Sequence, residues 1–418
     1  MNPIEQTYRA LTPRSAALAE RACVRLPGGD TRAAGHHLPY PLTLERAEGP
    51  HVFDVDGRGY LDLIGNFTSL VHGNAYPPIV EAITRQAARG TAWPARNEAQ
   101  LELAEEIACR APSIEQLRFT NSGTEATMLA AAISRAVTGR RKVLMARYGY
   151  HGSLEDFELG FFGHEEHDTL LAPFGDAAGF EAVLDRQGAE IACVILEPVM
   201  GSAGLIASPP GFLERVRAAA HAAGALFVLD EVITLRLAVG GAQALHDAPP
   251  DLTALGKIIG GGLPVGAIGG RRELLAVTHP DNPRVFHSGT FNGNPLTAAA
   301  GLVSLRHLTA ERIERMHAQA EVLVAGLRAA AARVGLPFSV NHAGSLVQVF
   351  FAAEAPSARL ERTDGHLAHL FHLAALNHGL FFSGRGLMAL STVLGDDHLA
   401  EAVDRAGAAM ADVARTVG

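Results

Sequence analysis

The chain is poor in cysteine, and the few cysteines that it has follow no recognisable pattern. Three occur among 418 residues, at Cys23, Cys109 and Cys193. Their number is odd and none belongs to a C-x-x-C pair, so cysteine supplies no metal or redox motif. All three fall in stretches with helix or strand character. We therefore expect buried packing residues, no bound metal, and a reducing compartment such as the cytoplasm.

Positive charge is also scarce. With 35 Lys and Arg against 44 Asp and Glu, the formal net charge is -9 and the pI is about 6.1. Such a chain has no basic footprint for nucleic acid and no cationic face for anionic lipid. The first 25 residues are interrupted by charges and contain no unbroken apolar run, which argues against a signal peptide or a membrane span. The expectation is a soluble enzyme that binds neither nucleic acid nor membrane.

The apolar pattern predicts an α/β protein. Short β-rich runs alternate with amphipathic stretches, as in βαβ units around a mostly parallel sheet. The apolar stripe between residues 211 and 223 predicts a helix that docks on this sheet. Candidate strands lie at 117–120, 142–146, 192–196, 226–229 and 265–268.

The same pattern predicts two domains. With 48% hydrophobic residues, the chain can build one large core and a smaller one. A long apolar stripe from Ile313 to Val334 predicts a connecting helix, after which the composition changes. We expect a large domain over 51–310 and a small domain over 311–418, with residues 1–50 packing against the small one. The sequence shows no internal repeat and no low-complexity tract.

An acid and an amine stand at the ends of two predicted strands. Asp230 begins the sequence D-E-V, and Lys257 lies within L-G-K-I-I-G-G-G. A pyridoxal phosphate enzyme needs this pair, because a carboxylate keeps the pyridine nitrogen protonated and an amine forms an imine with the aldehyde. A lone lysine is usually a solvated surface charge, so the interpretation depends on the residues around the pair.

A strand, turn and helix start are predicted for R-F-T-N-S-G-T-E-A, from Arg118 to Ala126. Ser122, Gly123 and Thr124 would present backbone amides and hydroxyls where the helix begins. The free amides and the positive end of the helix dipole make this place suitable for a phosphate. The alternative is an ordinary N-cap in which Ser122 or Thr124 satisfies the first amides.

Two further segments could complete a cofactor site. In Y-G-Y-H-G, Tyr150 could lie over a flat ring, with His151 and Gly152 shaping the turn, although a loop tyrosine is more often surface packing. In H-S-G-T-F-N-G-N-P, Thr290 could supply another hydroxyl to a phosphate.

These segments, in this order, resemble class III aminotransferases of the fold type I pyridoxal phosphate enzymes. The resemblance spans nearly the whole chain and includes N-S-G-T-E-A, Y-H-G, E-P-V-M-G, D-E-V, L-G-K-x-I-G-G-G and S-G-T-F-N-G-N-P. It implies a large domain with a seven-stranded sheet and a small α+β domain built from both termini. It implies that Lys257 binds the cofactor covalently, Asp230 pairs with its ring nitrogen and Ser122, Gly123 and Thr124 bind its phosphate. Tyr150 and Val232 would enclose the ring.

The resemblance also implies a homodimer, because Thr290 would reach the phosphate of the other subunit. The family's reaction moves an amino group from a donor to the cofactor and then to a keto acid, in two half-reactions with Lys257 as the proton carrier. Burial near a charged cofactor would lower the pKa of Lys257.

Three departures within the family bear on the substrate. Ser202 replaces the glutamate of E-P-x-x-G-E, which is typical of enzymes that act on ornithine or γ-aminobutyrate. Arg385, in F-F-S-G-R-G, stands where family members hold the carboxylate of an α-amino or α-keto acid. Arg32, in P-G-G-D-T-R-A-A-G-H-H-L-P-Y-P-L, lies in a segment similar to that of aminotransferases for aromatic β-amino acids, although His36 and His37 replace an expected apolar wall. A guanidinium matches a carboxylate bidentately, but Arg32 could equally be a surface charge.

The sequence therefore predicts a homodimeric aminotransferase that passes the amino group of a β-amino acid, aromatic or not, to pyruvate or 2-oxoglutarate. Alternatives are an isomerase similar to glutamate-1-semialdehyde aminomutases, whose P-G-G at 27–29 and G-G-A-Q at 240–243 also occur here, a broad-specificity amine transaminase, and a racemase. A non-catalytic protein that keeps the cofactor fold is a further alternative. The glycines at 260–266 do not form a G-x-G-x-x-G turn, so a dinucleotide site is not expected.

Overall fold

The chain divides into two compact units. The computed structural model describes residues 1–165, 168–357 and 365–418. The described part of the terminal unit comprises residues 1–76, 314–356 and 365–418, and that of the central unit comprises 77–165, 168–313 and Ser357. The domain limits expected at 50 and 310 stay a prediction.

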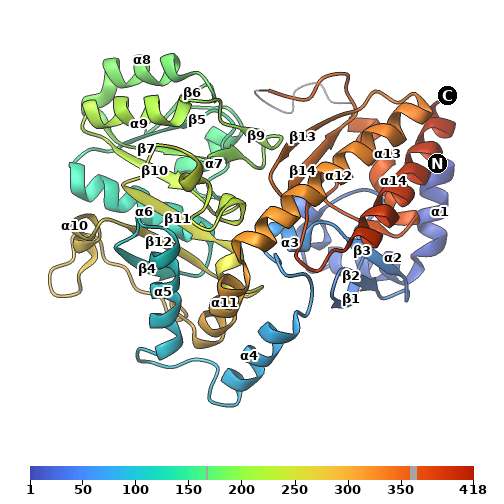
Figure 1. Ribbon diagram of the computed structural model, residues 1–418, viewed down its shortest axis with the longest axis horizontal. Helices are drawn as coiled ribbons and strands as arrows, with labels where there is room; N and C mark the ends of the chain where they lie inside the picture. The colour runs from blue at the N-terminus through green and yellow to red at the C-terminus, as the bar shows by residue number, and fades with distance from the viewer. Residues whose placement is uncertain (166–167, 358–364) are drawn as a thin grey trace. The chain divides into compact units, whose positions relative to one another are not determined.

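The central unit contains a seven-stranded sheet (Figure 1). Neighbouring strands are parallel except that β12 runs antiparallel to both β11 and β4. The mostly parallel α/β architecture and the five predicted strands are therefore confirmed. In spatial order the strands are β4 (Gln116–Thr120), β12 (Gly266–Gly270), β11 (Leu252–Gly256), β10 (Leu226–Asp230), β7 (Ile191–Leu196), β5 (Lys142–Ala146) and β6 (Thr169–Ala172).

Both faces of this sheet are covered, which explains why its middle strands are apolar throughout. Successive side chains of a strand point to opposite faces. On β7, Cys193 and Ile195 join one buried cluster, whereas Val194 and Leu196 join another. The helix α6 (Gly123–Thr138) contributes to the first cluster, and α8 (Ala177–Gln187) and α9 (Phe212–Ala222) contribute to the second. The helix predicted between residues 211 and 223 is α9, so that prediction is confirmed.

The remaining elements of the central unit lie around this sheet. Two short strands, β8 (Val199–Met200) and β9 (Ile206–Ala207), form a separate ribbon. The other helices are α4 (Pro77–Ala87), α5 (Glu98–Arg110), α7 (Glu155–Phe161), α10 (Arg272–Leu275) and α11 (Pro295–His307), with single turns η3 (Gly188–Glu190), η4 (Thr234–Leu237), η5 (Ala242–Leu245), η6 (Lys257–Gly260) and η7 (Ala276–Thr278). The predicted connecting helix is α12 (Ala310–Val334). The boundary between the two units falls within its first turns, after Ile313.

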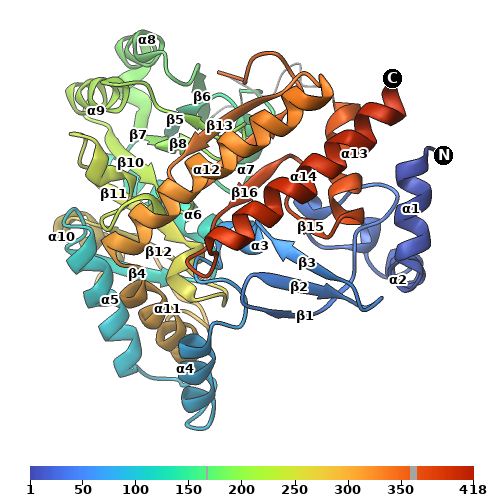
Figure 2. The ribbon, with the colours of Figure 1, turned by 45° about the vertical axis from the view of Figure 1, so that its right-hand side comes forward.

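The terminal unit joins segments from the two ends of the chain. The strand β3 (Gly59–Asp62) pairs in parallel with β15 (Leu380–Phe381), and β1 (Leu44–Glu48) and β2 (His51–Asp54) complete that sheet. A second sheet contains β13 (Ser339–Ala343), β14 (Leu346–Phe350) and β16 (Leu387–Ala389). Helices α13 (Gly365–Asn377) and α14 (Asp396–Val417) pack together (Figure 2), and α1 (Pro3–Leu11) contacts α13. The other helices are α2 (Pro13–Cys23), η1 (Pro27–Gly29), η2 (Ala33–Gly35) and the turn α3 (Gly65–Thr68).

The expectation for the cysteines was wrong at two positions. Cys193 is buried in β7, and burial raises the pKa of its thiol to about 11. Cys23 and Cys109 are exposed. Cys23 is the last residue of α2, and Cys109 lies about 200° around α5 from the buried Ile107, so it faces away from the core. Both positions fit a helix, but neither belongs to the helix's buried face.

Within residues 1–165, 168–357 and 365–418, every helix is too short or too polar to cross a bilayer.

Candidate active site

Asp230 ends β10 and is held in place by two donors. Its carboxylate is almost fully buried. One oxygen, Oδ1, accepts from the amide of Val232 at 3.0 Å, and Oδ2 lies 2.9 Å from Nδ1 of His151. Because an ionised carboxylate only accepts hydrogen bonds, Nδ1 of His151 is the donor. The acid therefore has a fixed orientation at the carboxyl end of a central strand.

Lys257 follows the neighbouring strand β11, whose Ala254 pairs with Asp230. It has a left-handed backbone, with φ of 50°, at the start of η6. Such a conformation costs a residue other than glycine about 1 to 2 kcal/mol, and strain of this kind is often found at functional sites. Burial lowers the pKa of the amine, and the carboxylates of Asp230 and Glu197 offset part of this shift.

The chain contains only two lysines. The other, Lys142 on β5, is held at 2.9 Å from Oε1 of Gln187 and 3.0 Å from Oε2 of Glu190. Lys257 is therefore the one lysine whose amine lies among buried acids with its pKa lowered, which is the state a nucleophilic amine requires.

The first turn of α6 combines the two roles that the sequence left open, namely helix capping and phosphate binding. Oγ of Ser122 accepts from the amide of Glu125 at 3.1 Å, so this side chain is an N-cap. The amides of Gly123 and Thr124 lie in the same turn, and the first amides of a helix have no acceptor within it. They can bind an anion at the positive end of a 16-residue helix while Ser122 caps a third amide.

Two glycines allow this turn to approach its neighbours closely. A Cβ on Gly266 of β12 would lie 2.0 Å from the carbonyl oxygen of Ser122. A Cβ on Gly123 would lie 3.0 Å from a methyl group of Val232, which follows Asp230 by two residues. The small residues in N-S-G-T and L-P-V-G are thus required by the packing that brings the helix start next to the acid.

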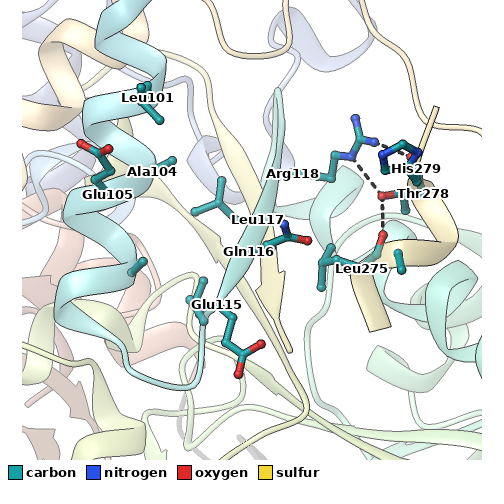
Figure 3. A pocket seen from close by; sticks show the side chains of 13 residues that line it. Leu101, Ala104, Glu105, Glu115, Gln116, Leu117, Arg118, Leu275, Thr278 and His279 are labelled. Atoms are coloured by element: carbon teal, nitrogen blue, oxygen red, sulfur yellow. Dashed lines mark hydrogen bonds between the residues drawn. The ribbon is translucent and has the colours of Figure 1, made fainter. Parts of the chain in front are cut away.

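Arg118, which begins the predicted phosphate motif, does not belong to this site. Its Nε donates to Oγ1 of Thr278 at 3.0 Å, and its Nη2 donates to the carbonyl oxygen of the same residue. Figure 3 shows it beside Thr278 and His279, in a pocket of about 440 Å³ that α5 lines with Leu101 and Ala104. Only the turn and helix residues of this motif, from Ser122 onward, therefore belong to the candidate site.

The loop from Tyr148 to Gly152 is anchored beside the acid and the helix start. The buried His151 reaches Asp230, and its carbonyl oxygen accepts from Oγ1 of Thr127 on α6 at 2.6 Å. Gly152 has φ of 102°, and a Cβ there would lie 2.5 Å from Oγ1 of Thr124. Tyr150 remains 36% exposed, and its ring makes an edge contact with Phe161 at 5.4 Å between centroids.

Sequence reasoning missed the contacts of two further residues of this site. His151 was expected to shape the turn, but it is the partner of Asp230. Glu197, in E-P-V-M-G, is buried with both oxygens occupied, accepting from the amides of Tyr150 and Gly201 at 3.0 Å each. Burial, and then the charge of Asp230, raise the pKa of Glu197 to about 7. Both residues stand in motifs that were recognised, but their partners lie 47 and 79 residues away along the chain.

Thr290 is exposed in the loop that precedes α11. Two residues later, Oδ1 of Asn292 accepts from Nδ2 of Asn121 at 2.8 Å, directly before the capping Ser122. The loop is therefore fixed against the start of α6 in its own chain.

Arg32 and Arg385 belong to the terminal unit, whereas the residues above belong to the central unit. The guanidinium of Arg32 donates to Oδ1 of Asn66 at 2.8 Å and lines a cavity of about 480 Å³. The backbone of Arg385 is fixed by Nε2 of Gln348, which donates to its carbonyl oxygen at 3.0 Å, while its side chain is exposed.

The central-unit residues match the chemistry of pyridoxal 5'-phosphate. They provide one amine for an aldehyde, one oriented carboxylate for a ring nitrogen, and a helix start for a phosphate. Each of the three groups of that cofactor thus has a residue type suited to it.

Comparison with known proteins gives the family. The model of aminotransferase class-III matches residues 32–410. The chain is 37% identical over 397 residues to a glutamate-1-semialdehyde 2,1-aminomutase of Rhodopirellula baltica, covering 89% of this chain and 90% of that protein. It is 38% identical over 404 residues to a beta-phenylalanine transaminase of Variovorax paradoxus, covering 94% and 92%.

Solved structures agree with this result. An omega-transaminase from Sphaerobacter thermophilus superposes with a TM-score of 0.90 at 37% identity, covering 96% of this chain and 97% of that one. Similar structures include a transaminase with pyridoxal phosphate bound. The fold type I architecture predicted from the sequence is confirmed. The chain belongs to the class III aminotransferases, which are enzymes that use pyridoxal 5'-phosphate.

Proposed function

We propose that this enzyme transfers the amino group of a β-amino acid to a keto acid, pyruvate or 2-oxoglutarate, with Lys257 and Asp230 as its catalytic residues. The observation that carries the substrate class is a pair of arginines. Neither Arg32 nor Arg385 has a carboxylate partner among the described residues. An arginine without an acid is suited to bind the carboxylate of a ligand.

The surroundings of Arg32 support this assignment. The residue that accepts its hydrogen bond, Asn66, lies in a left-handed turn with Phe67 and Thr68, whose φ angles are 48°, 53° and 76°. The carboxylate of Asp62 holds this turn by accepting from the amides of Ile64 and Gly65 at 2.9 and 3.0 Å. Three successive strained residues persist only where the surrounding structure imposes them. The turn fixes Asn66, and Asn66 fixes the guanidinium.

The central-unit residues supply the proton chemistry. When bound, the cofactor provides an aldehyde that captures the amino group and a ring that accepts electrons as the substrate C–H bond breaks. Lys257 removes and returns that proton, which requires a neutral amine, and burial lowers its pKa in the needed direction. Asp230, oriented by His151 and Val232, holds the ring nitrogen in its protonated form. The turn of Ser122, Gly123 and Thr124 binds the phosphate, and Tyr150 and Val232 enclose the ring.

A matrix of donors and acceptors tests the substrate class. β-Amino acids are expected to react faster than simple amines, and faster turnover of the amines would overturn the proposal. Replacing Arg32 by Ala should raise KM for the donor by about 10- to 100-fold, as expected for one lost charge-assisted hydrogen bond. Replacing Arg385 by Ala should do the same for the keto acid. Arg21→Ala, at an exposed position on α2, is the matched control and should change neither KM.

We further propose that the enzyme is a homodimer in which Thr290 serves the partner's phosphate site. Two large apolar side chains that flank Thr290 are unusually exposed, Phe286 at 85% and Phe291 at 60%. Aromatic side chains are enriched at surfaces that bind another protein, so two exposed phenylalanines near Thr290 fit an interface there.

Subunit complementation tests this arrangement. Mixed dimers of Lys257→Ala and Thr290→Ala subunits contain one intact site only if Thr290 acts across the interface. Activity should therefore rise on mixing above that of either variant alone. No increase in mixed dimers, verified by mass, would contradict the assignment.

The second candidate is an internal aminomutase, which is favoured by the likeness to glutamate-1-semialdehyde 2,1-aminomutases. Conversion of one aminated substrate to its positional isomer without added keto acid would establish it. Arg385 favours transamination, because it offers a carboxylate site for the second keto acid. The three free cysteines fit a reducing cytoplasm as the proposed location.

A further inference from the structure

Glu197 links two backbone segments that are distant in sequence. It directly follows β7, and its side chain is 5% exposed. Oε2 accepts from the amide of Tyr150 and Oε1 from the amide of Gly201, each at 3.0 Å. Both oxygens of one buried carboxylate are thus used to hold main chain, one at Tyr150 and one at Gly201.

The tether at Tyr150 is the part closest to the proposed ring site. Its neighbour His151 is fixed by Asp230 at 2.9 Å and by Thr127 at 2.6 Å. Among the described residues, the ring of Tyr150 itself has one aromatic neighbour, Phe161, which it contacts edge-on. The backbone anchors therefore decide where this ring lies, and Glu197 provides the anchor on Tyr150 itself.

The anchor needs a carboxylate. Two N–H donors converge on two acceptor oxygens, whereas a glutamine amide would present one acceptor and one donor. In a glutamine variant the side-chain NH2 would face one of the two backbone N–H groups. The hydrogen bond to either Tyr150 or Gly201 would then be lost. Glutamate in its acid form is a poorer anchor, because it carries no charge and its hydroxyl oxygen is a weaker acceptor than a carboxylate oxygen.

We propose that Glu197 is a positioning residue that holds the backbone of Tyr150 so that the Tyr150 ring stacks on the cofactor, and thereby controls the tilt and affinity of the bound cofactor. This inference rests on the proposed role of Tyr150. It extends that role by naming the residue on which the stacking depends.

The charges around Glu197 give the anchor a pH dependence. His151, Asp230 and Lys257 are the titratable groups that act on it, and its pKa is raised to about 7. Above this pH the carboxylate can hold both amides. Below it the acid form predominates, so the anchor on Tyr150 or Gly201 weakens.

A double-mutant cycle on the holoenzyme tests the proposal. Wild type, Glu197→Gln, Tyr150→Ala and the double variant are titrated with pyridoxal 5'-phosphate, and visible circular dichroism is recorded per mole of bound cofactor. Glu197→Gln should weaken binding by about tenfold, as for one lost hydrogen bond to a charged group, and reduce the ellipticity. In the Tyr150→Ala background the same change should have little further effect, because residues that act together are not additive.

The matched control is Glu231→Gln. Glu231 is also buried and also uses both carboxylate oxygens on main chain, but it accepts from the amides of Ala242 and Gln243, at 2.9 and 2.6 Å. This variant should lower the melting temperature but leave the ellipticity per bound cofactor unchanged. The wild-type ellipticity should also fall with an apparent pKa near 7, and this step should be absent in Glu197→Gln.

The outcomes separate this inference from the proposed site. If Tyr150→Ala weakens the cofactor but Glu197→Gln does not, or if the two effects are additive, the inference is overturned and the site stands. If Tyr150→Ala binds the cofactor as tightly as wild type, the stacking role and the inference fail together. Should Glu197→Gln not fold, Glu197→Asp keeps the charge but is one methylene too short to hold both amides, and it enters the same cycle with the same expected non-additivity.

Discussion

Nδ1 of His151 lies 2.9 Å from Oδ2 of Asp230, and both side chains are almost fully buried. The histidine lies in the loop after β5, and the acid is the last residue of β10. The hydrogen bond therefore joins two segments that are far apart in the sequence. Because the imidazole donates to one oxygen and the Val232 amide to the other, the carboxylate cannot rotate freely. The acid is thereby pre-oriented, which makes its charge more effective than that of a mobile side chain.

The first prediction concerns the covalent link. Borohydride reduction of the cofactor-loaded enzyme should label the peptide that contains Lys257. Because the chain has only two lysines, peptide mapping needs to distinguish only this peptide from the one with Lys142. Lys257→Ala should lose the label and reduce turnover by about 10³-fold or more, since it removes both nucleophile and proton carrier. Lys142→Ala should keep the label, and a label on Lys142 would refute the assignment.

Asp230→Asn should reduce kcat by about 100-fold or more while the protein stays folded, because the charge opposite the ring nitrogen is lost and the shape is kept. Single-turnover kinetics with a donor measure this effect. Asp251→Asn is the control, since Asp251 is equally buried but binds Arg271, His221 and the amide of Phe227 instead. It should cost stability and leave the chemical step intact. Equal kinetic losses in both variants would show that Asp230 is only structural.

Gly266→Ala should weaken cofactor binding and lower the melting temperature. The added methyl group would overlap the carbonyl oxygen of Ser122, so the start of α6 must move. Overpacking of this kind costs about 1 to 3 kcal/mol. Absorbance titration with the cofactor and thermal unfolding measure the two effects. Gly365→Ala, where a Cβ meets no atom within 4 Å, should change neither quantity, and unchanged binding in Gly266→Ala would contradict the proposed phosphate site.

The terminal unit should lose stability in mild acid. Burial lowers the pKa of His37 to about 4 and that of His372 well below its usual value, and the two rings touch at 4.7 Å between centroids. The unfolded chain therefore binds more protons than the folded one between about pH 6.5 and pH 4, and the free energy of unfolding falls as pH falls through this window.

Thermal unfolding at several pH values tests this expectation. His372→Phe keeps an aromatic ring next to His37 and Phe382 but removes one of the titrating groups. The fall in melting temperature between pH 6.5 and pH 4 should be smaller in this variant than in wild type. His279→Gln, which replaces an exposed histidine, should keep the wild-type dependence. An unchanged dependence in His372→Phe would exclude this source of acid sensitivity.

The sequence by itself determined the fold class and the family. Five strands, the helix α9 and the connecting helix α12 could be predicted because apolar periodicity follows from which faces of an element are buried. Asp230, Lys257 and Ser122 could be proposed as site residues because they stand at the ends of such elements in recognisable motifs. These are local properties, and a local pattern is enough to indicate them.

The tertiary structure decided which residues act as partners. The bonds from His151 to Asp230 and from Glu197 to Tyr150 join residues far apart in sequence, and no local pattern encodes such a pairing. The same holds for Gly266. This position must be glycine because β12 brings it against Ser122, and that contact exists only in the folded protein. The exposure of Cys23 and Cys109 also depended on which face of each helix met the core. Sequence sets what each segment becomes, whereas packing between segments sets which atoms meet, because hydrogen bonds and close contacts depend on distances of a few ångström that chain order does not fix.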